Sequence, residues 1–324
     1  MRDTILYGDC RHTLTTLRSH ITTGICDKPR MCVTSPPYYG LRDYGGESNQ
    51  IGQEDSPEEY IQNLVEVFRG VRDCLSDDGT LWLNMGDSYY NYRPGKGQAL
   101  VKQTVSATKQ DLPDKCARRG NKLEGLKEKD LIGIPWMLAF ALRADGWYLR
   151  QDIIWHKPNP MPESVRDRCT KAHEYVFLLS KNKKYYYDNE SIKEPAKDWG
   201  TRDRSKGKYH NEGTGLQPHS GLTKSYPTKN KRSVWNITNK PFKGAHFAVF
   251  PPDLIIPCIK AGSSEGDIVL DPFMGSGTTA MVARDLKRNY IGCELHEDYS
   301  TLIDERVPTN KVVHNGLTDA IDGL

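Results

Sequence analysis

The 324-residue sequence lacks the patterns that mark membrane, secreted and metal-binding proteins. No apolar run approaches the roughly 20 residues that a membrane-spanning helix needs, and MRDTILYGDC at the start has no long apolar core of a signal peptide. The eight cysteines contain no CxxC pair and no Cys/His cluster at metal-ligand spacing. We therefore expect a cytoplasmic protein with reduced thiols, no membrane partner and no metal.

A strong net charge is also lacking, since the formal value is only +3 at neutral pH. Residues 197–232, however, hold nine basic and three acidic residues, a net charge of +6, so the remainder is slightly acidic. This segment, almost free of aliphatic residues, is either a solvated linker or a phosphate-contacting surface. In the second interpretation Tyr209, Tyr226 and Trp235 add stacking contacts. A second basic insertion, residues 93–125, favours a polyanionic partner.

What the sequence does contain is an alternation of helical and strand patterns. Apolar residues recur at helical spacing over 56–75, where Ser56 is a candidate N-cap and Pro57 suits the first turn. Further helices are expected over 134–146, 253–262 and 278–287, and strands over 80–86, 147–157, 173–181, 267–273 and 289–295. This alternation predicts an α/β fold with a doubly wound, mostly parallel, Rossmann-like sheet covered by helices on both faces.

The C-terminal segment DIVLDPFMGSGTTAMVARDLKRNYIGCEL carries the strongest motif. A strand ends at Asp271 and a helix begins near Thr278. The loop between them holds Gly275 and Gly277, and such a loop lets a ligand approach the backbone at a helix N-terminus. Glu294 ends the next strand, about 20 residues on, where doubly wound folds place the carboxylate that binds ribose hydroxyls. Because the loop is neither GxGxxG nor GxxxxGK[ST], a nucleoside without a polyphosphate fits better than NAD or ATP.

A second motif, TSPPYYG, follows the apolar run of residues 31–33. Together with DPFMGSGTT it resembles the amino-directed (N4-cytosine/N6-adenine) DNA methyltransferases, which use S-adenosyl-L-methionine. The order, SPPY first and DPFMGSGTT last, resembles the beta class, in which the two halves of the fold are circularly permuted. LYGDC, DGTLWLN, WHKPNPMP, RSVWNI and HFAVFPPDLI also match, so the resemblance covers most of residues 1–189 and 232–305.

The resemblance implies a domain organisation. Residues 1–189 are expected to form the catalytic half with a basic insertion at about 90–130, residues 190–240 the target-recognition insertion, and residues 241–324 the cofactor-binding half. Double-stranded DNA is the expected partner, and a cognate restriction endonuclease and a homodimer are further partners that the resemblance allows. The residues expected to contact DNA are Arg202, Arg204, Lys206, Lys208, Lys231 and Arg232.

The chemistry of amino methylation accounts for the SPPY motif. An exocyclic amino nitrogen is a poor nucleophile because its lone pair is delocalised into the ring, so acceptors must hold its two hydrogens and aim the lone pair. Prolines donate no N–H and have a fixed φ, so they present carbonyls rigidly. The resemblance makes Ser35 and the Pro36 carbonyl these acceptors, next to Pro37. Tyr38 would stack on a base rotated out of the duplex.

The resemblance also implies cofactor contacts. Asp271 would contact the methionine part and Phe273 the adenosine or sulfonium region, while Glu294 would bind the ribose hydroxyls and Asp9 would lie by the adenine. Phe273 could equally belong to the core, and Asp9 could be a turn cap. Ser276 and Thr278 would help to hold the cofactor carboxylate, and His246 and Phe247 would lie at the methionine end. Gly275 and Gly277 are the remaining expected contacts.

A further group of residues is expected near the extruded base: Tyr39, Trp155, His156 and Lys157. A Trp-His pair at a strand end most often packs in the core, and nothing in the sequence brings His156 to the amino group as a base. Where some relatives have an acid after the strand TLWL, this chain has Asn84, with Asp87 three residues later. We therefore expect the amino group to lose its proton to solvent after methyl transfer.

Within the family that the sequence resembles, SPPY favours N4 of cytosine as the target, with N6 of adenine as the alternative. A nucleic-acid-binding protein that kept the fold and lost catalysis is the alternative from another class, and RNA is an alternative substrate. The intact SPPY motif and glycine loop argue against a pure binding protein.

Overall fold

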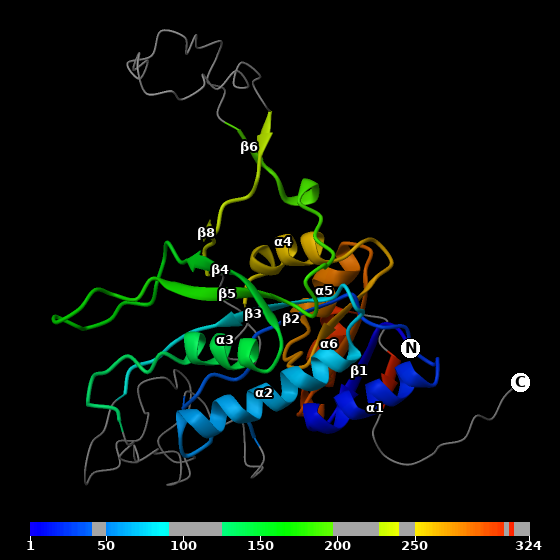
Figure 1. Cartoon of the computed structure of the whole chain (residues 1–324), viewed down its shortest axis with the longest axis horizontal. Helices are drawn as coiled ribbons and strands as arrows, with labels where there is room; N and C mark the ends of the chain where they lie inside the picture. The colour runs from blue at the N-terminus through cyan, green and yellow to red at the C-terminus, as the bar shows by residue number, and fades with distance from the viewer. Residues whose placement is uncertain (41–49, 91–124, 197–226, 240–249, 308–310, 314–324) are drawn as a thin grey trace, which may run out of the picture.

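The computed structural model describes residues 1–40, 50–90, 125–196, 227–239, 250–307 and 311–313 (Figure 1). The helices are α1 (Cys10–Thr22), α2 (Pro57–Cys74), α3 (Ile134–Ala144), α4 (Pro252–Gly262), α5 (Thr278–Asp285) and α6 (Ser300–Arg306), with the 3-10 turns η1 (Glu190–Ile192) and η3 (Glu297–Tyr299). The strands are β1 (Thr4–Tyr7), β2 (Met31–Thr34), β3 (Thr80–Met85), β4 (Tyr148–His156), β5 (His173–Ser180), β6 (Glu194–Pro195), β7 (Thr228–Lys229), β8 (Val234–Asn236), β9 (Ile268–Asp271), β10 (Asn289–Glu294) and β11 (Lys311–Val313). Within these ranges no helix is both long and apolar enough to cross a bilayer.

One nine-stranded sheet organises the molecule, in the order β11-β1-β10-β9-β2-β3-β5-β4-β8. Every pairing is parallel except the two made by β5, which runs antiparallel to β3 and to β4. The mostly parallel α/β fold expected from the sequence is therefore confirmed. The C-terminal strands β9 and β10 lie between β1 and β2, so the two ends of the chain share the middle of the sheet.

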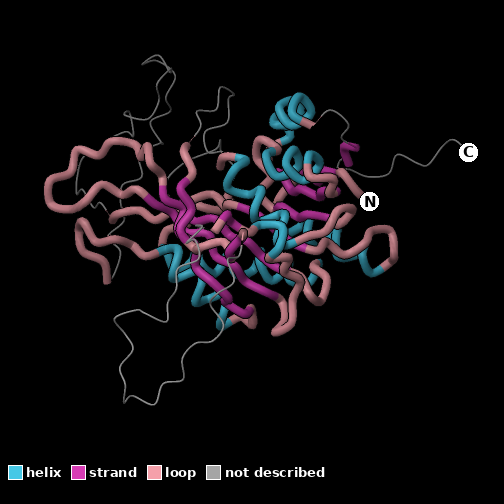
Figure 2. Tube along the Cα trace, turned by 90° about the horizontal axis from the view of Figure 1, so that it is seen from above, coloured by secondary structure: helices cyan, strands magenta, loops and turns pink. Residues whose placement is uncertain are grey.

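Helices cover both faces of this sheet (Figures 1 and 2). Successive side chains of a strand point to opposite faces, so Leu6 packs with α1, α2 and α3, whereas Ile5 and Tyr7 pack with α4, α5 and α6. The interior strands are buried along their whole length, as expected for parallel strands covered on both sides.

Local signals in the sequence set the start of α2. Ser56 is its N-cap, with the side-chain oxygen accepting from the Glu59 backbone N–H at 3.2 Å, and Pro57 occupies the first turn. Both roles were predicted. Tyr60, Leu64 and other residues on the apolar stripe are buried against the sheet.

Pairing of β2 with β9 brings the two sequence motifs together. Met31 lies beside Val269 and Cys32 beside Leu270 in parallel register. At the carboxyl ends of the two strands, Thr34 Oγ1 donates to Asp271 Oδ1 at 2.6 Å, across 237 residues of sequence. SPPY and the glycine loop therefore leave the sheet side by side.

Part of the segment 190–240, which was expected to be an insertion, belongs to the main sheet. Its residues 234–236 form β8, which pairs in parallel with β4. Trp235 is buried, and its Nε1 donates to the Arg232 carbonyl at 2.8 Å. The predicted stacking role of Trp235 on nucleic acid is therefore wrong, because the ring packs in the core. Tyr209 and Tyr226 lie outside the described residues.

Candidate active site

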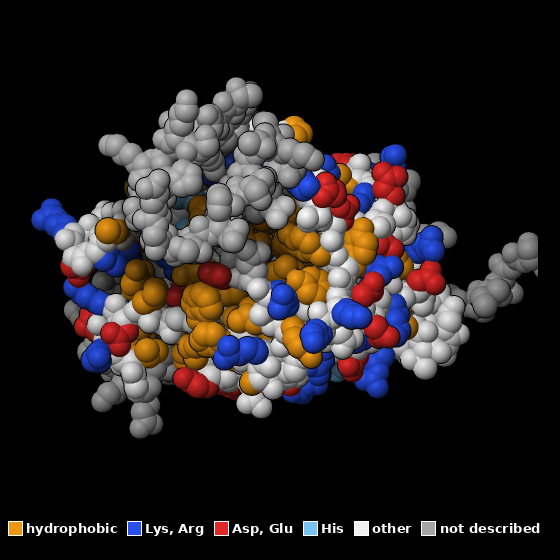
Figure 3. All heavy atoms as spheres, turned by 45° about the horizontal axis from the view of Figure 1, so that its top comes forward, with side chains coloured by type: hydrophobic (Ala, Val, Ile, Leu, Met, Phe, Trp, Pro, Cys, Tyr) orange, Lys and Arg blue, Asp and Glu red, His pale blue; other side chains and the backbone are white. Residues whose placement is uncertain are grey.

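A cavity of about 730 Å³ opens at the edge of the sheet where the parallel strands end. Its walls come from the residues after β1, β2, β3, β4, β9 and β10 and from the first residues of β5, which begins at the same edge because it runs antiparallel. Open α/β sheets bind ligands at this edge. On the face seen in Figure 3, hydrophobic side chains gather centrally and Lys and Arg side chains border them.

The SPPY motif forms one wall, and all four of its residues line the cavity. The Pro37 carbonyl accepts from the Tyr60 hydroxyl of α2 at 2.7 Å, which fixes the turn to the helix behind it. Tyr38 donates from its hydroxyl to Glu174 Oε2 at 2.8 Å, and Asn84 Oδ1 lies 3.4 Å from the same hydroxyl. Burial, reinforced by the charge of Glu174, raises the pKa of Tyr38 well above its ordinary value. The phenol therefore remains a protonated donor.

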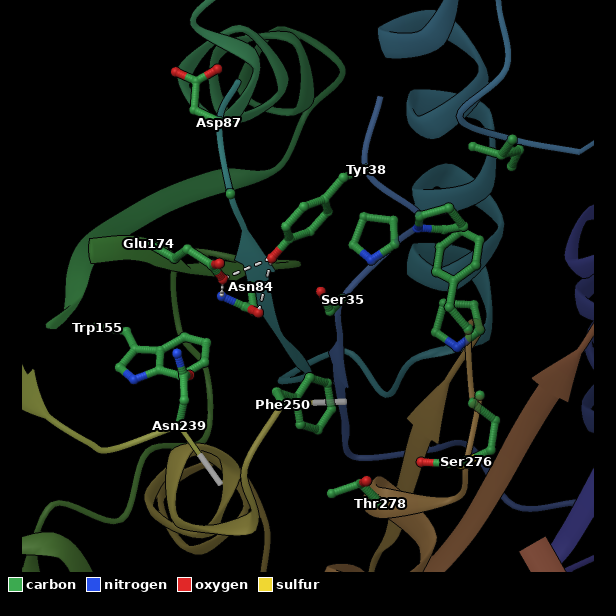
Figure 4. Close-up of a pocket in the computed structure, with 18 of the residues that line it drawn as sticks. Ser35, Tyr38, Asn84, Asp87, Trp155, Glu174, Asn239, Phe250, Ser276 and Thr278 are labelled. Carbon is green, nitrogen blue, oxygen red and sulfur yellow. Dashed lines mark hydrogen bonds between the residues drawn. The ribbon is translucent and has the colours of Figure 1, made fainter. Parts of the chain in front are cut away.

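Glu174, on β5, is the carboxylate at the centre of this wall (Figure 4). Besides Tyr38, it accepts from Asn84 Nδ2 at 3.3 Å and forms an ion pair with Lys157 Nζ. The side chains of Glu174 and Lys157 are 16% and 17% exposed, so the pair is largely shielded from water. Sequence reasoning missed Glu174, and the only available signal was an acid at the start of a strand pattern.

Asp87, three residues after Asn84, has a structural role at the start of a helix. Its Oδ1 accepts from the backbone N–H groups of Gly133 and Ile134 at 3.0 and 3.2 Å, which caps the start of α3. In Figure 4 its carboxylate points away from Tyr38 and Glu174. The acid beside Asn84 is therefore Glu174, supplied by a neighbouring strand.

The neighbouring wall is built by the glycine loop and β10. Gly275 and Gly277 have φ of +55° and +78°, so the loop turns where other residues would be strained. The Gly275 N–H donates to Glu294 Oε2 at 2.7 Å, and the His296 N–H donates to Oε1 at 3.0 Å. Burial raises the pKa of Glu294 to about 7, although these hydrogen bonds oppose the shift.

Two hydroxyls at the start of α5 are organised by Arg306, which sequence reasoning also missed. Arg306 Nη1 donates to Ser276 Oγ at 2.7 Å, to the Ser276 carbonyl at 2.9 Å and to Thr278 Oγ1 at 3.0 Å. The helix begins after Gly277, and no side chain caps its first N–H groups. This end of the cavity thus offers backbone N–H groups and fixed hydroxyls to an anionic group.

Comparisons with known proteins agree with this geometry. The profile of the N6/N4 DNA methylase family matches residues 30–305, which is most of the chain. The type II methyltransferase M.SmaI of Serratia marcescens is 49% identical over 308 residues, covering 94% of this chain and 90% of the relative. The chain belongs to this DNA methylase family.

Solved structures show the same fold at low identity. TTHA0409 from Thermus thermophilus, a putative DNA modification methylase complexed with S-adenosyl-L-methionine, is 21% identical, with a TM-score of 0.58 and coverage of 97% of this chain and 99% of that one. PvuII DNA methyltransferase, described as cytosine-N4-specific, is 17% identical, with a TM-score of 0.58 and coverage of 98% and 89%.

In this DNA methylase most of the residues expected to contact the cofactor line the cavity, and Asp271 stands behind its wall. Phe273, Gly275, Ser276, Thr278 and Glu294 line the cavity. So does Asp9, which also has the local role considered for it, because its side chain accepts from the Arg11 N–H as the N-cap of α1. His246 and Phe247 lie outside the described residues.

Asp271 is 1% exposed and stands behind the cavity wall. Its oxygens accept from Thr34 Oγ1 and Thr279 Oγ1, both at 2.6 Å, and from the Phe273 N–H at 3.0 Å. Burial raises its pKa to about 6. The geometry favours a positioning role, in which Asp271 holds the glycine loop to β2, over the expected direct contact with cofactor.

Only some of the residues expected around the base line the cavity. Trp155 and Lys157 line the cavity, whereas His156, between them on the strand, points to the other side and bonds through Nδ1 to Asn236 Oδ1 at 2.7 Å. Tyr39 packs on Tyr60 with ring centroids 5.4 Å apart. Neither His156 nor Tyr39 is among the residues that line the cavity, so the geometry does not support their expected role beside the base.

The basic residues expected to contact DNA are only partly described. Lys231 and Arg232 pair with Glu194 at 3.9 and 3.1 Å and lie away from the main cavity. Arg202, Arg204, Lys206 and Lys208 lie outside the described residues.

Proposed function

We propose that this chain is a type II DNA methyltransferase that transfers the methyl group of S-adenosyl-L-methionine to N4 of cytosine in double-stranded DNA. The observation that carries the proposal is the meeting of SPPY and the glycine loop in one cavity, where Thr34 bonds to Asp271. A volume of about 730 Å³ suits a nucleoside cofactor together with one extruded base. A cognate endonuclease and a homodimer remain predictions.

The glycine-loop wall fits the cofactor. Glu294, beside the Gly275 turn, accepts the ribose hydroxyls, and Phe273 packs against the nucleoside. Ser276, Thr278 and the N–H groups of α5 hold the carboxylate. When bound there, S-adenosyl-L-methionine supplies an electrophilic methyl group carried on a sulfonium.

The SPPY wall prepares the base. Ser35 Oγ and the Pro36 carbonyl accept the two amino hydrogens, which directs the nitrogen lone pair towards the cofactor side. Tyr38 stacks on the base, with its ring held by Glu174 and by the close approach of Gly86, where a Cβ would come within 2.6 Å of the ring. After transfer, the cationic amino group loses its proton to solvent at the mouth of the cavity.

The target atom is tested by nucleoside mass spectrometry. DNA incubated with the protein and isotope-labelled cofactor is expected to yield N4-methylcytosine, because serine occupies the first position of the SPPY motif. Labelled N6-methyladenine alone would contradict the cytosine assignment and favour the adenine alternative. No labelled nucleoside in DNA or RNA, with DNA binding intact, would favour a binding protein without catalysis.

Substitution of Glu174 by Gln tests its hold on Tyr38. Gln keeps the size and one acceptor but loses the charge shared with Lys157, so we expect the tyrosine ring to sample other positions. A hydrogen bond to a charged group contributes about 1.5–3 kcal/mol, and Gln retains part of that contribution. The rate of single-turnover methylation should therefore fall about tenfold. Cofactor affinity should not change. Glu265→Gln, whose side chain pairs with Lys287 at 3.5 Å outside the cavity, is the size-matched control, and an equal loss in both variants would contradict the role of Glu174.

A further inference from the structure

The loop that joins β4 to β5 carries an unusual side chain at the mouth of the cavity. Met161 is 77% exposed, more than any other large hydrophobic side chain in the described ranges. It stands between Pro160 and Pro162, and all three residues line the cavity. The loop projects beyond the sheet as the extended green segment of Figure 1. A single exposed apolar residue is ordinary on a protein surface, so exposure alone does not indicate a function. The position of Met161 and the contacts that hold its loop provide the argument.

The loop is anchored on both sides of Met161. Before it, Asn159 Nδ2 donates to the Asn239 carbonyl at 3.1 Å, and the Asn239 N–H donates back to Asn159 Oδ1 at 3.0 Å. After it, Glu163 accepts from Arg168 Nη1 at 2.7 Å and from the Lys171 N–H at 3.1 Å. The two prolines fix φ on either side. Within the described part of the chain, Met161 is therefore presented to solvent by a braced loop.

The surroundings of Met161 suit a nucleic acid duplex. Residues 157–172 contain four basic and two acidic residues, a net charge of +2, which favours phosphate on either side of the tip. Arg168 lies over the ring of Tyr89, 3.8 Å from its centroid, and donates to Glu163, which lines the cavity. The apolar tip thus stands at the entrance through which a base must pass to reach Tyr38.

We propose that Met161 is a wedge that enters the gap left in the duplex when the target base is extruded. The inference rests on the proposed function, since it concerns how the same cavity receives its base. Extrusion breaks pairing and stacking, and an apolar side chain inserted between base steps replaces part of the lost stacking. Methionine suits this task because its unbranched thioether adapts to the shape of the gap.

The test compares Met161→Ala with wild type on two duplexes that contain the mapped methylation site. In one the target base is paired, and in the other it faces a mismatch, which lowers the cost of extrusion. We expect kcat/KM to fall about 10- to 30-fold on the paired duplex, as for the loss of 1.4–2 kcal/mol, and to stay within about threefold of wild type on the mismatched one. With 2-aminopurine at the target position, the fluorescence gain on binding should shrink on the paired duplex.

Two further variants keep the test decisive. Met161→Leu keeps an apolar side chain of similar size and should retain wild-type activity. Ile25→Ala removes another exposed apolar side chain, 60% exposed and outside the cavity, and should have no effect. If Met161→Ala lowers kcat/KM equally on both duplexes, or on neither, the proposed wedge role of Met161 is wrong. Absence of any wild-type methyl transfer to DNA would instead overturn the proposed function, and with it this role of Met161.

Discussion

Replacement of Ser35 by Ala is expected to lower the rate of methyl transfer by about 100-fold or more, the effect of removing one fixed hydrogen-bonding group that acts on the reacting atoms. Ser35 Oγ is one of only two groups proposed to hold the amino hydrogens, so its loss lets the nitrogen lone pair return to conjugation with the ring. Tyr38, which is proposed to stack on the base, is held separately by Glu174. The loss should therefore appear in the chemical step.

The measurement is single-turnover transfer of labelled methyl to the mapped DNA site, with cofactor affinity followed separately. Cofactor affinity should stay within about twofold of wild type, since Ser35 lies on a different wall of the cavity from Glu294 and the glycine loop. Ser276→Ala is the matched control, because it removes the same hydroxyl from the cofactor wall and should weaken cofactor binding instead. A transfer rate within threefold of wild type in Ser35→Ala would remove serine from the proposed chemistry.

Replacement of Glu294 by Ala is expected to weaken cofactor binding by about 100-fold, because two charge-assisted contacts and the brace on the glycine loop are lost together. In the free protein this carboxylate accepts from the Gly275 and His296 N–H groups at 2.7 and 3.0 Å. Isothermal titration with S-adenosyl-L-methionine gives the affinity directly. Glu297→Ala is the control, because it removes an acid near the same strand end that does not line the cavity. It should leave cofactor affinity unchanged.

The pKa of Glu294, raised by burial to about 7, makes this binding depend on pH. Ribose hydroxyls and the cationic sulfonium favour the ionised carboxylate, so cofactor affinity should fall as pH is lowered through 7, by at most tenfold per pH unit. Stability of the free protein should change the opposite way. A carboxyl whose folded pKa exceeds its unfolded value contributes stability below the unfolded value and loses that contribution as pH rises through the folded pKa.

Glu294→Gln separates these effects, because Gln keeps the shape without titrating. Between pH 8 and pH 6, wild type should gain thermal stability relative to Glu294→Gln while losing cofactor affinity relative to it. Asp271, with its pKa raised to about 6, contributes to the stability trend in both proteins, so the difference between their profiles reports mainly on Glu294. Parallel pH profiles in wild type and Glu294→Gln would contradict the assignment of the titrating group.

The elements themselves were largely readable from the sequence. Residues 57–74 form a helix because apolar side chains recur at its period behind a Ser-Pro start, and residues 268–294 form strand, glycine turn, helix and strand because each carries its own local signal. The SPPY motif and Glu294 could likewise be found in advance, since backbone-rigid prolines and a strand-ending acid are local chemistry.

What only the tertiary structure decided was which distant residues meet. Pairing of β2 with β9 joins the two motifs, and the antiparallel direction of β5 brings Glu174 to the edge where parallel strands end. Strand alternation turns His156 away from the cavity and Trp155 towards it, and the register of β8 buries Trp235. These outcomes depend on the order and direction of strands, which arise from long-range pairing and packing. The sequence by itself therefore predicts the motifs that make up this site. Which of them lie next to each other is decided by the tertiary structure.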